Sequence, residues 1–141
     1  MNVCLNRQAD LSQGFSLLEL LATLAIVSLL IVMSYPLYTN YVLKTHRVHA
    51  ETALLDLAGG LERYHATHQT YVGATLADAQ VNPYTDDDRY QLEIASASEN
   101  NYLVKAFPLG AQKEDNACGT LSLNQLGEKG ISGSGQVTDC W

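Results

Sequence analysis

A run of 21 residues from Phe15 to Tyr35 contains a single ionisable side chain, that of Glu19. At about 1.5 Å per residue, a helix of this length spans roughly 30 Å, the thickness of a bilayer's hydrocarbon core. A carboxylate costs up to about 3 kcal/mol at the centre of such a helix and less near its end. The run therefore predicts a membrane-spanning helix in which Glu19 has a functional partner, followed by at most one modest domain.

The start of this run carries a family signal. The heptapeptide GFSLLEL, from Gly14 to Leu20, resembles the class III signal of type IV pilins and of type II secretion pseudopilins. The resemblance implies cleavage between Gly14 and Phe15 by a prepilin peptidase and methylation of the new N-terminal Phe15 by the same enzyme. Gln13 stands where the family often has a basic residue. A secretory signal would have a shorter apolar region ending in small residues, and neither feature is present.

The resemblance also implies that Glu19 guides subunit assembly. After cleavage, the free amine of Phe15 would lie in or beside a region of low dielectric constant, where an unpaired charge is costly. The Glu19 carboxylate of a neighbouring subunit would neutralise this amine and thereby fix one axial register. The alternative is a carboxylate that only reaches the lipid headgroups, a behaviour more typical of Lys and Arg.

The rest of the chain is acidic. From residue 37 onward there are 13 acidic and 7 basic side chains, a net charge of −6. Such a domain has no general attraction for nucleic acid, which we therefore do not expect as a partner. Lys105, Lys113 and Lys129 are too few and too scattered to predict a basic stripe.

Two of the three cysteines fall in the predicted domain. Cys4 belongs to the predicted leader, which leaves Cys118 and Cys140. An exported domain of this size readily forms a disulfide, which would stabilise the fold by about 3 kcal/mol. The alternative is a pair of free thiols in a cytoplasmic domain. The orientation with Met1 in the cytoplasm depends on the resemblance and on this pair.

The helix is predicted to continue past the apolar run, from about Ser16 to about His65, with a kink rather than an end at Pro36. Beyond Pro36, residues at three- and four-residue steps form a first stripe: Tyr38, Tyr41, Val42, Thr45, Val48, Thr52 and Leu55. A later, more apolar stripe is predicted to pack on the domain: Ala50, Leu54, Leu57, Ala58, Leu61 and Tyr64. Charged residues between the stripes are expected to face outward: Arg47, Glu51, Asp56, Glu62 and Arg63. Gly59-Gly60 predicts close packing against a sheet or a local bend.

A turn-rich connection, residues 67–89, follows the helix, and Tyr71, Val72 and Leu76 are expected to pin it to the core. Alternating and β-rich segments then predict four strands: Tyr90–Ile94, Tyr102–Phe107, Gly119–Leu123 and Lys129–Ser132. Turns are expected at 99–101 and 126–128, and a flexible link at 133–135. Strands after one long helix predict an α+β fold with a small antiparallel sheet on the helix. The domain plan is a leader (1–14), a membrane or filament-core helix (15–36) and a globular domain (37–141) with its sheet at 90–132.

Later segments extend the resemblance to most of the chain. They are similar to the minor pilins called the PilE subgroup: PLY at 36–38, LERY at 61–64, TY at 70–71, AFPLGAQ at 106–112, DNACGTL at 115–121 and CW at 140–141. The resemblance implies the pilin fold, with Cys118 and Cys140 bracketing a C-terminal segment called the D-region. Trp141 is expected to pack over the disulfide.

Metal and catalytic sites are not predicted. His46 with His49 and His65 with His68 have a spacing that could hold a metal, but a polar helix face is the simpler interpretation. The acidic triplet 86–88 lacks the Gly and closing Glu of an EF-hand and is interpreted as a solvated loop. No nucleophile and base, phosphate loop or paired acid site is recognisable, so we expect no cofactor and a substrate of enzymes rather than an enzyme.

Taken with the resemblance, the sequence predicts a minor type IV pilin, made as a single-pass inner-membrane precursor and then built into an extracellular pilus. Its expected partners are other pilins, the prepilin peptidase and the inner-membrane assembly machinery. It would support adhesion, twitching motility or DNA uptake. The alternatives are a type II secretion pseudopilin, a DNA-binding subunit at the pilus tip, and a membrane-anchored adhesin outside any filament.

Overall fold

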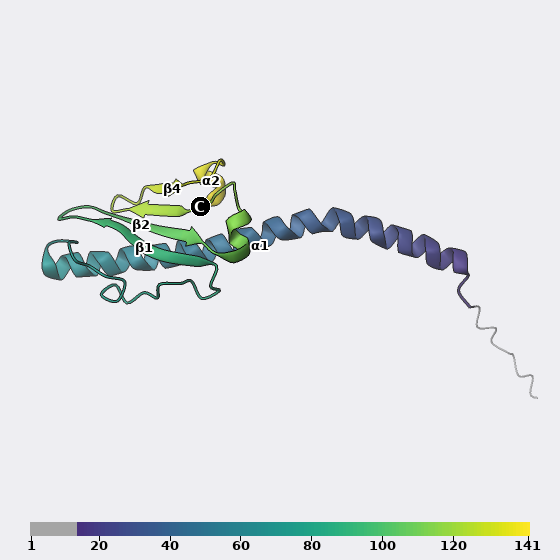
Figure 1. Cartoon of the computed structure of the whole chain (residues 1–141), viewed down its shortest axis with the longest axis horizontal. Helices are drawn as coiled ribbons and strands as arrows, with labels where there is room; N and C mark the ends of the chain where they lie inside the picture. Colours follow the sequence, from purple (N-terminus) through teal and green to yellow (C-terminus); the bar gives the residue numbers. More distant parts are fainter. Residues whose placement is uncertain (1–13) are drawn as a thin grey trace, which may run out of the picture. The chain divides into compact units, whose positions relative to one another are not determined.

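A computed structural model describes residues 14–141, in two compact units that divide after Tyr38. The predicted leader, apart from Gly14, lies outside the described residues. One long helix, α1 (Leu17–His68), is followed by β1 (Tyr90–Ala97), β2 (Tyr102–Pro108), the 3-10 helix η1 (Gly110–Glu114), β3 (Leu121–Asn124), β4 (Lys129–Ile131) and the short helix α2 (Val137–Cys140). The α+β class is confirmed, with the elements in the predicted order (Figure 1).

Helix α1 begins within one residue of the predicted start and ends three residues beyond the predicted end. It continues through Pro36, as expected, and the predicted kink there stays a prediction. Polar side chains within the apolar part bond back to their own helix, since the hydroxyls of Ser28 and Ser34 donate to Leu24 O and Leu30 O. Inside a membrane, where no water is available, such bonds would keep the hydroxyls satisfied.

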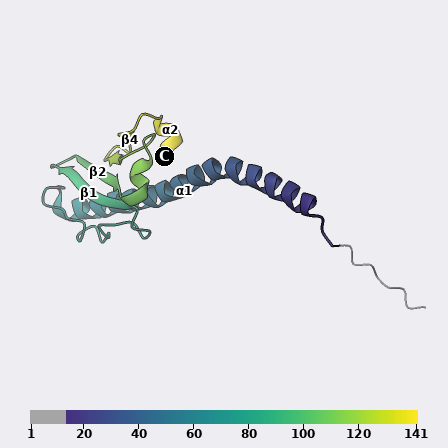
Figure 2. The same cartoon turned by 45° about the vertical axis from the view of Figure 1, so that its right-hand side comes forward.

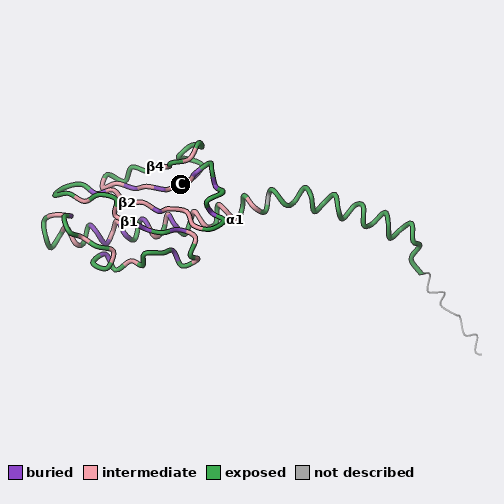
Figure 3. The backbone as a smooth tube through the Cα atoms, viewed as in Figure 1, coloured by how far each residue is buried: buried purple, intermediate pink, exposed green. Residues whose placement is uncertain are grey.

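In the second unit, residues 39–141, a four-stranded antiparallel sheet in the order β1-β2-β3-β4 lies on one face of α1 (Figures 1 and 2). The predicted later stripe supplies the helix side of the core through Ala50, Leu54, Leu57 and Leu61, none of them exposed. Inward-pointing strand residues supply the other side: Tyr90, Leu92, Tyr102, Val104, Ala106, Leu121 and Leu123. Buried backbone is concentrated where these two layers meet (Figure 3).

The connection from 69 to 89 packs along the flank of α1 rather than under the sheet. A Cβ on Gly60 would lie 2.5 Å from Ala79 Cβ and 2.6 Å from Ala79 O. The expected close packing at the glycine pair is therefore present, but its partner is this connection and not the sheet. Tyr71 is buried as expected, whereas Val72 is 55% exposed and does not pin the segment to the core.

The C-terminal region is closed by a disulfide between Cys118 and Cys140, with a Cα–Cα distance of 5.5 Å. The segment 133–135 is not the flexible link expected from its composition. Its amides donate to three carbonyls of the segment before β3, Cys118 O, Asn116 O and Ala117 O. Trp141 donates its Nε1–H to Gly130 O at 3.1 Å, which ties the chain's last residue to β4.

Candidate functional sites

The first candidate site is the N-terminal part of α1. Phe15 is 78% exposed, Glu19 lies exposed in the first turn, and no other side chain among residues 14–141 pairs with Glu19. Within this described part, α1 is the one helix long and apolar enough to cross a membrane, and its most apolar window is entirely unburied. An uncovered apolar helix needs either lipid or other helices around it.

The second half of α1 carries what we call the free stripe, consisting of Tyr41, Thr45, Val48, Thr52 and Leu55. These residues are all exposed, all uncharged, and spaced alternately by four and three positions. At about 100° per residue, the stripe lies on the side of the helix roughly opposite the core residues. Five of the seven residues of the predicted first stripe thus form a separate, exposed helix face, with the spacing typical of helix–helix packing.

Arg47 was expected to face outward, but its side chain is mostly buried against Asp115, in the segment that precedes Cys118. Its Nε donates to Asp115 Oδ2 at 2.6 Å, and the two side chains are 13% and 2% exposed. Gln112 is buried beside them and donates to Leu43 O and to the hydroxyl of Tyr90. Burial raises the pKa of Tyr90 to about 12. The sequence contained Asp115 in a family-like motif but held no signal that Arg47, 68 positions earlier, is its partner.

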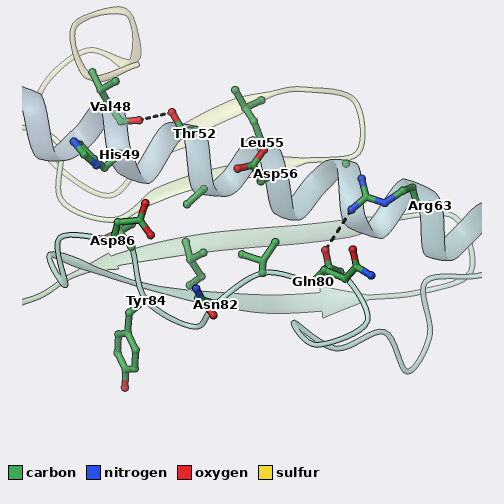
Figure 4. A pocket seen from close by; sticks show the side chains of 16 residues that line it. Val48, His49, Thr52, Leu55, Asp56, Arg63, Gln80, Asn82, Tyr84 and Asp86 are labelled. Atoms are coloured by element: carbon green, nitrogen blue, oxygen red, sulfur yellow. Dashed lines mark hydrogen bonds between the residues drawn. The ribbon is translucent and has the colours of Figure 1, made fainter.

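A cleft of about 630 Å³ lies between α1 and the 79–86 segment (Figure 4). The free-stripe residues Val48, Thr52 and Leu55 form part of its helix wall. The lining includes two acidic residues, Asp56 and Asp86, and one basic residue, Arg63, so the cleft has no excess of positive charge that would attract an anionic ligand such as DNA.

The histidines do not pair with one another as the spacing allowed. His46 Nδ1 lies 2.6 Å from Asp87 Oδ2, whereas His65 stacks on Tyr71. Burial alone would raise the pKa of Asp87, but bonds from Thr85, from His46 and from a backbone amide outweigh it and lower that pKa. The acidic triplet is therefore partly structural rather than wholly solvated. Among residues 14–141 no group of three or more His, Cys, Asp or Glu side chains is placed to hold a metal.

Comparisons with known proteins place these features in a class. A model of the prokaryotic N-terminal methylation motif matches residues 11–35. The non-core minor pilin PilV of Neisseria meningitidis has a TM-score of 0.56 and 19% identity, over 68% of this chain and 92% of that one. A type IV pilin from Shewanella oneidensis is 26% identical over 70% of this chain and 97% of that one, with a TM-score of 0.48. Comparison with curated proteins found no match. The N-terminal motif and the pilin fold define a type IV pilin.

A second family model assigns the chain to one family within the type IV pilins. The model described as type IV minor pilin ComP, DNA uptake sequence receptor, matches residues 36–122, more than half of the chain. The chain belongs to this ComP family of type IV minor pilins. It is accordingly a structural subunit, made as a membrane-anchored precursor with an N-methylation motif and assembled with other pilins into extracellular pili. The prediction of a minor pilin is confirmed, and the match favours it over the pseudopilin alternative.

Proposed function

We propose that this minor pilin acts in DNA uptake, as a subunit that joins the pilus through α1 and binds DNA with its globular unit. The family match over residues 36–122 carries the proposal, because the family is described as a receptor for DNA uptake sequences. The DNA-binding alternative is thus preferred over the initial expectation that nucleic acid is not a partner. The net charge of −6 argued against general binding, but it does not argue against a local surface of opposite sign.

Assembly would proceed from processing at the N-terminus. Cleavage between Gly14 and Phe15 and methylation of Phe15 would be carried out by the prepilin peptidase, with the inner-membrane assembly machinery as a further partner. The exposed, unpaired Glu19 supports the proposal that its partner is the Phe15 amine of a neighbouring subunit. The chain would itself perform no catalysis and need no cofactor.

The assembly proposal is tested by changing Glu19 to Ala. We expect a chain that is still cleaved and still in the inner membrane, but poorly recovered in filaments sheared from the cell surface. Intact mass and N-terminal sequencing of the unchanged protein from such filaments should give an N-methylated Phe15 start. Normal recovery of the Ala variant, or a Met1 start in filaments, would contradict the proposal.

The DNA-uptake proposal is tested by deleting the protein in its host and restoring it from a plasmid. We expect DNA uptake to be lost while surface pili and protein secretion remain. Loss of secretion with intact uptake would instead support the pseudopilin alternative. Loss of all pili would show a role in initiating filaments, and DNA binding by the purified full-length chain would then decide between the two roles.

A further inference from the structure

The cleft beside α1 and the free stripe have a wall in common. Val48, Thr52 and Leu55 belong to both, so a surface that covers these side chains also lies over one side of the cleft. The segment that faces them across the cleft is 79–86 (Figure 4). Packing of another subunit on the free stripe therefore changes the surroundings of every group at the edge of the cleft.

Two carboxylates lie on opposite walls of this cleft, Asp56 on α1 and Asp86 on the facing segment (Figure 4). Both residues are exposed, and neither side chain has a hydrogen bond or an ion pair within the described part of the chain. Their acidic neighbour Asp87, in contrast, bonds to His46 inside the subunit. Asp56 and Asp86 are thus available to a partner outside the subunit.

The lining has one fixed positive charge, and it does not neutralise these two carboxylates. The guanidinium of Arg63 donates to Ala79 O at 3.4 Å. Arg63 comes seven positions after Asp56 on α1, a rise of about 10 Å along the helix axis. With His49 counted as neutral, two acidic residues and one basic residue give the lining a net charge of −1.

A second hollow, of about 340 Å³, shares Val48 with the cleft. At about 100° per residue, its helix residues Lys44 and Glu51 lie on the opposite side of the free stripe from the cleft. Its two basic residues, Lys44 and Arg47, are matched by two acidic ones, Glu51 and Asp139. The stripe is therefore a ridge between two hollows, and of these two the cleft has the unbalanced negative charge.

Assembly makes the carboxylates of the cleft unfavourable unless the neighbouring subunit supplies a cation. Asp56 is four positions after Thr52, so the two side chains are neighbours on the helix surface. A subunit that covers the stripe at Thr52 therefore also displaces water from the Asp56 carboxylate. Such a carboxylate without a partner is costly, whereas a Lys or Arg beside it offsets the cost. A neighbour with a basic group at this place is accordingly preferred over one with an apolar or acidic group.

We propose that the cleft is a docking site for a basic side chain of the neighbouring pilin in the filament. The aliphatic part of a Lys or Arg side chain packs on the apolar wall at Val48 and Leu55, and its charged end pairs with Asp56 or Asp86. Anionic partners such as DNA or phospholipid headgroups have the wrong charge for this lining. The inference rests on the proposed function, because the subunit must join a pilus through α1. Within that assembly, the cleft helps to select which pilin stands beside this subunit.

The first experiment removes the two charges and measures recovery of the subunit in filaments sheared from the host. Asp56→Asn combined with Asp86→Asn is compared with Glu99→Gln combined with Glu114→Gln, which removes two exposed carboxylates that do not line the cleft. We expect the Asn pair to lower recovery severalfold, because the neighbour's cation loses its partner. The Gln pair should be recovered as the unchanged chain is. The amount of protein in the inner membrane and the unfolding temperature should be equal for all three chains.

The second experiment identifies the neighbour. Tyr84 lines the cleft and is 46% exposed, so it can be replaced by the photoreactive residue benzoylphenylalanine. Irradiation of intact filaments should join this residue to another pilin, and mass spectrometry should find a Lys or Arg at or beside the joined position. Changing that residue to Asp, or making Asp56→Lys alone, should lower recovery, and the two changes together should restore it.

Normal recovery of the Asn pair, or recovery above that of the unchanged chain, would overturn the proposed docking site, because the carboxylates would then have no cationic partner in the pilus. Equal losses for the Asn and Gln pairs would overturn it too, since net charge alone would then matter. A joined peptide from a protein outside the pilus, or one without a basic residue, would do the same. In each of these cases the unchanged chain is still found in filaments and the proposed function stands. Absence of the unchanged chain from sheared filaments would contradict the proposed function and the docking site together.

Discussion

At the scale of single residues, two adjacent glycines of α1 have opposite structural requirements. At Gly60 an added Cβ would meet the backbone of Ala79 at 2.6–2.7 Å, and at Gly59 it would meet only the end of Arg63 at 3.7 Å. Gly60→Ala should lower the free energy of unfolding by about 1–3 kcal/mol through overpacking. Gly59→Ala should raise it by up to about 1 kcal/mol, because Ala favours the helix.

Thermal unfolding of the two variants, followed by circular dichroism on the full chain in detergent, checks this prediction. The two variants are matched in sequence change and differ by one position. A loss of stability in both would mean that the 79–81 segment is not what requires the glycine, and that α1 itself needs flexibility there.

Two buried tyrosines predict a loss of stability at alkaline pH. Burial raises the pKa values of Tyr90 and Tyr102 to about 12, above the ordinary value of 10.0. The folded state thus holds these protons more tightly than the unfolded state, and the resulting stabilisation is fully present below pH 10. It is lost as pH rises from about 10 to about 12.

Absorbance of ionised tyrosine during an alkaline titration measures this effect. In the unchanged chain a late step near pH 12 should accompany unfolding, and Tyr90→Phe should reduce its amplitude while keeping the earlier steps. The Phe variant also removes the hydroxyl that accepts from Gln112. An unchanged late step would show that neither burial nor that bond controls the titration.

The sequence predicted those features of single residues that arise from positions close together in the chain, and missed those that join distant positions. The later stripe of α1 followed directly from helical spacing. Four of its five aliphatic members, at 50, 54, 57 and 61, are buried, and the fifth, Ala58, is partly buried. The pairing of Arg47 with Asp115 joins positions 68 apart and was missed. Spacing shows which side chains share a face, but not which distant charge the fold brings to that face.

At the scale of elements, all four strands were predicted, with errors at their ends. β1 runs on to Ala97, past a shift in the strand register between Ile94 and Ser96, where the alternation that predicted the strand is interrupted. The short helices η1 and α2 were not predicted, because elements of five and four residues carry too little periodicity. The segment 133–135 was misjudged for a related reason, since its order comes from backbone bonds to residues 116–118.

The disulfide closes the C-terminal end of the second unit. It links the segment before β3 to α2 across 22 positions. Replacing Cys118 and Cys140 together by Ser should lower the free energy of unfolding by about 3 kcal/mol in the chain-entropy model. The C-terminal residues from 133 onward should then lose protection against hydrogen exchange before α1 and β2 do.

Hydrogen exchange read by mass spectrometry, with the unchanged chain under oxidising and reducing conditions as the control, checks this order. Reduction of the unchanged chain should reproduce the variant's pattern. Uniform loss of protection over the whole second unit would show instead that the disulfide supports the entire domain and not one end of it.

At the scale of the whole molecule, the second unit presents two faces with different predicted partners. The free stripe of α1 is uncharged and lies opposite the sheet, as expected of a surface that packs against other helices in a filament. The globular unit also matches a family described as a receptor for DNA uptake sequences, and we propose that it binds DNA. Assembly and DNA binding are therefore expected to be separable by substitution.

The free stripe provides the last prediction. Val48→Asp places a charge in the stripe at a side chain that is 51% exposed, so the isolated subunit should fold normally. Burying that carboxylate against apolar helices without a partner costs several kcal/mol, and incorporation of the Val48→Asp variant into pili should therefore fall severalfold or more.

The matched control is Leu126→Asp, which introduces the same carboxylate at a 73% exposed residue in the turn between β3 and β4. Both variants should show the same unfolding temperature within error and bind duplex DNA as the unchanged chain does, while only Val48→Asp should be depleted from sheared filaments. Equal recovery of the two variants would mean that the free stripe remains solvent-facing in the pilus.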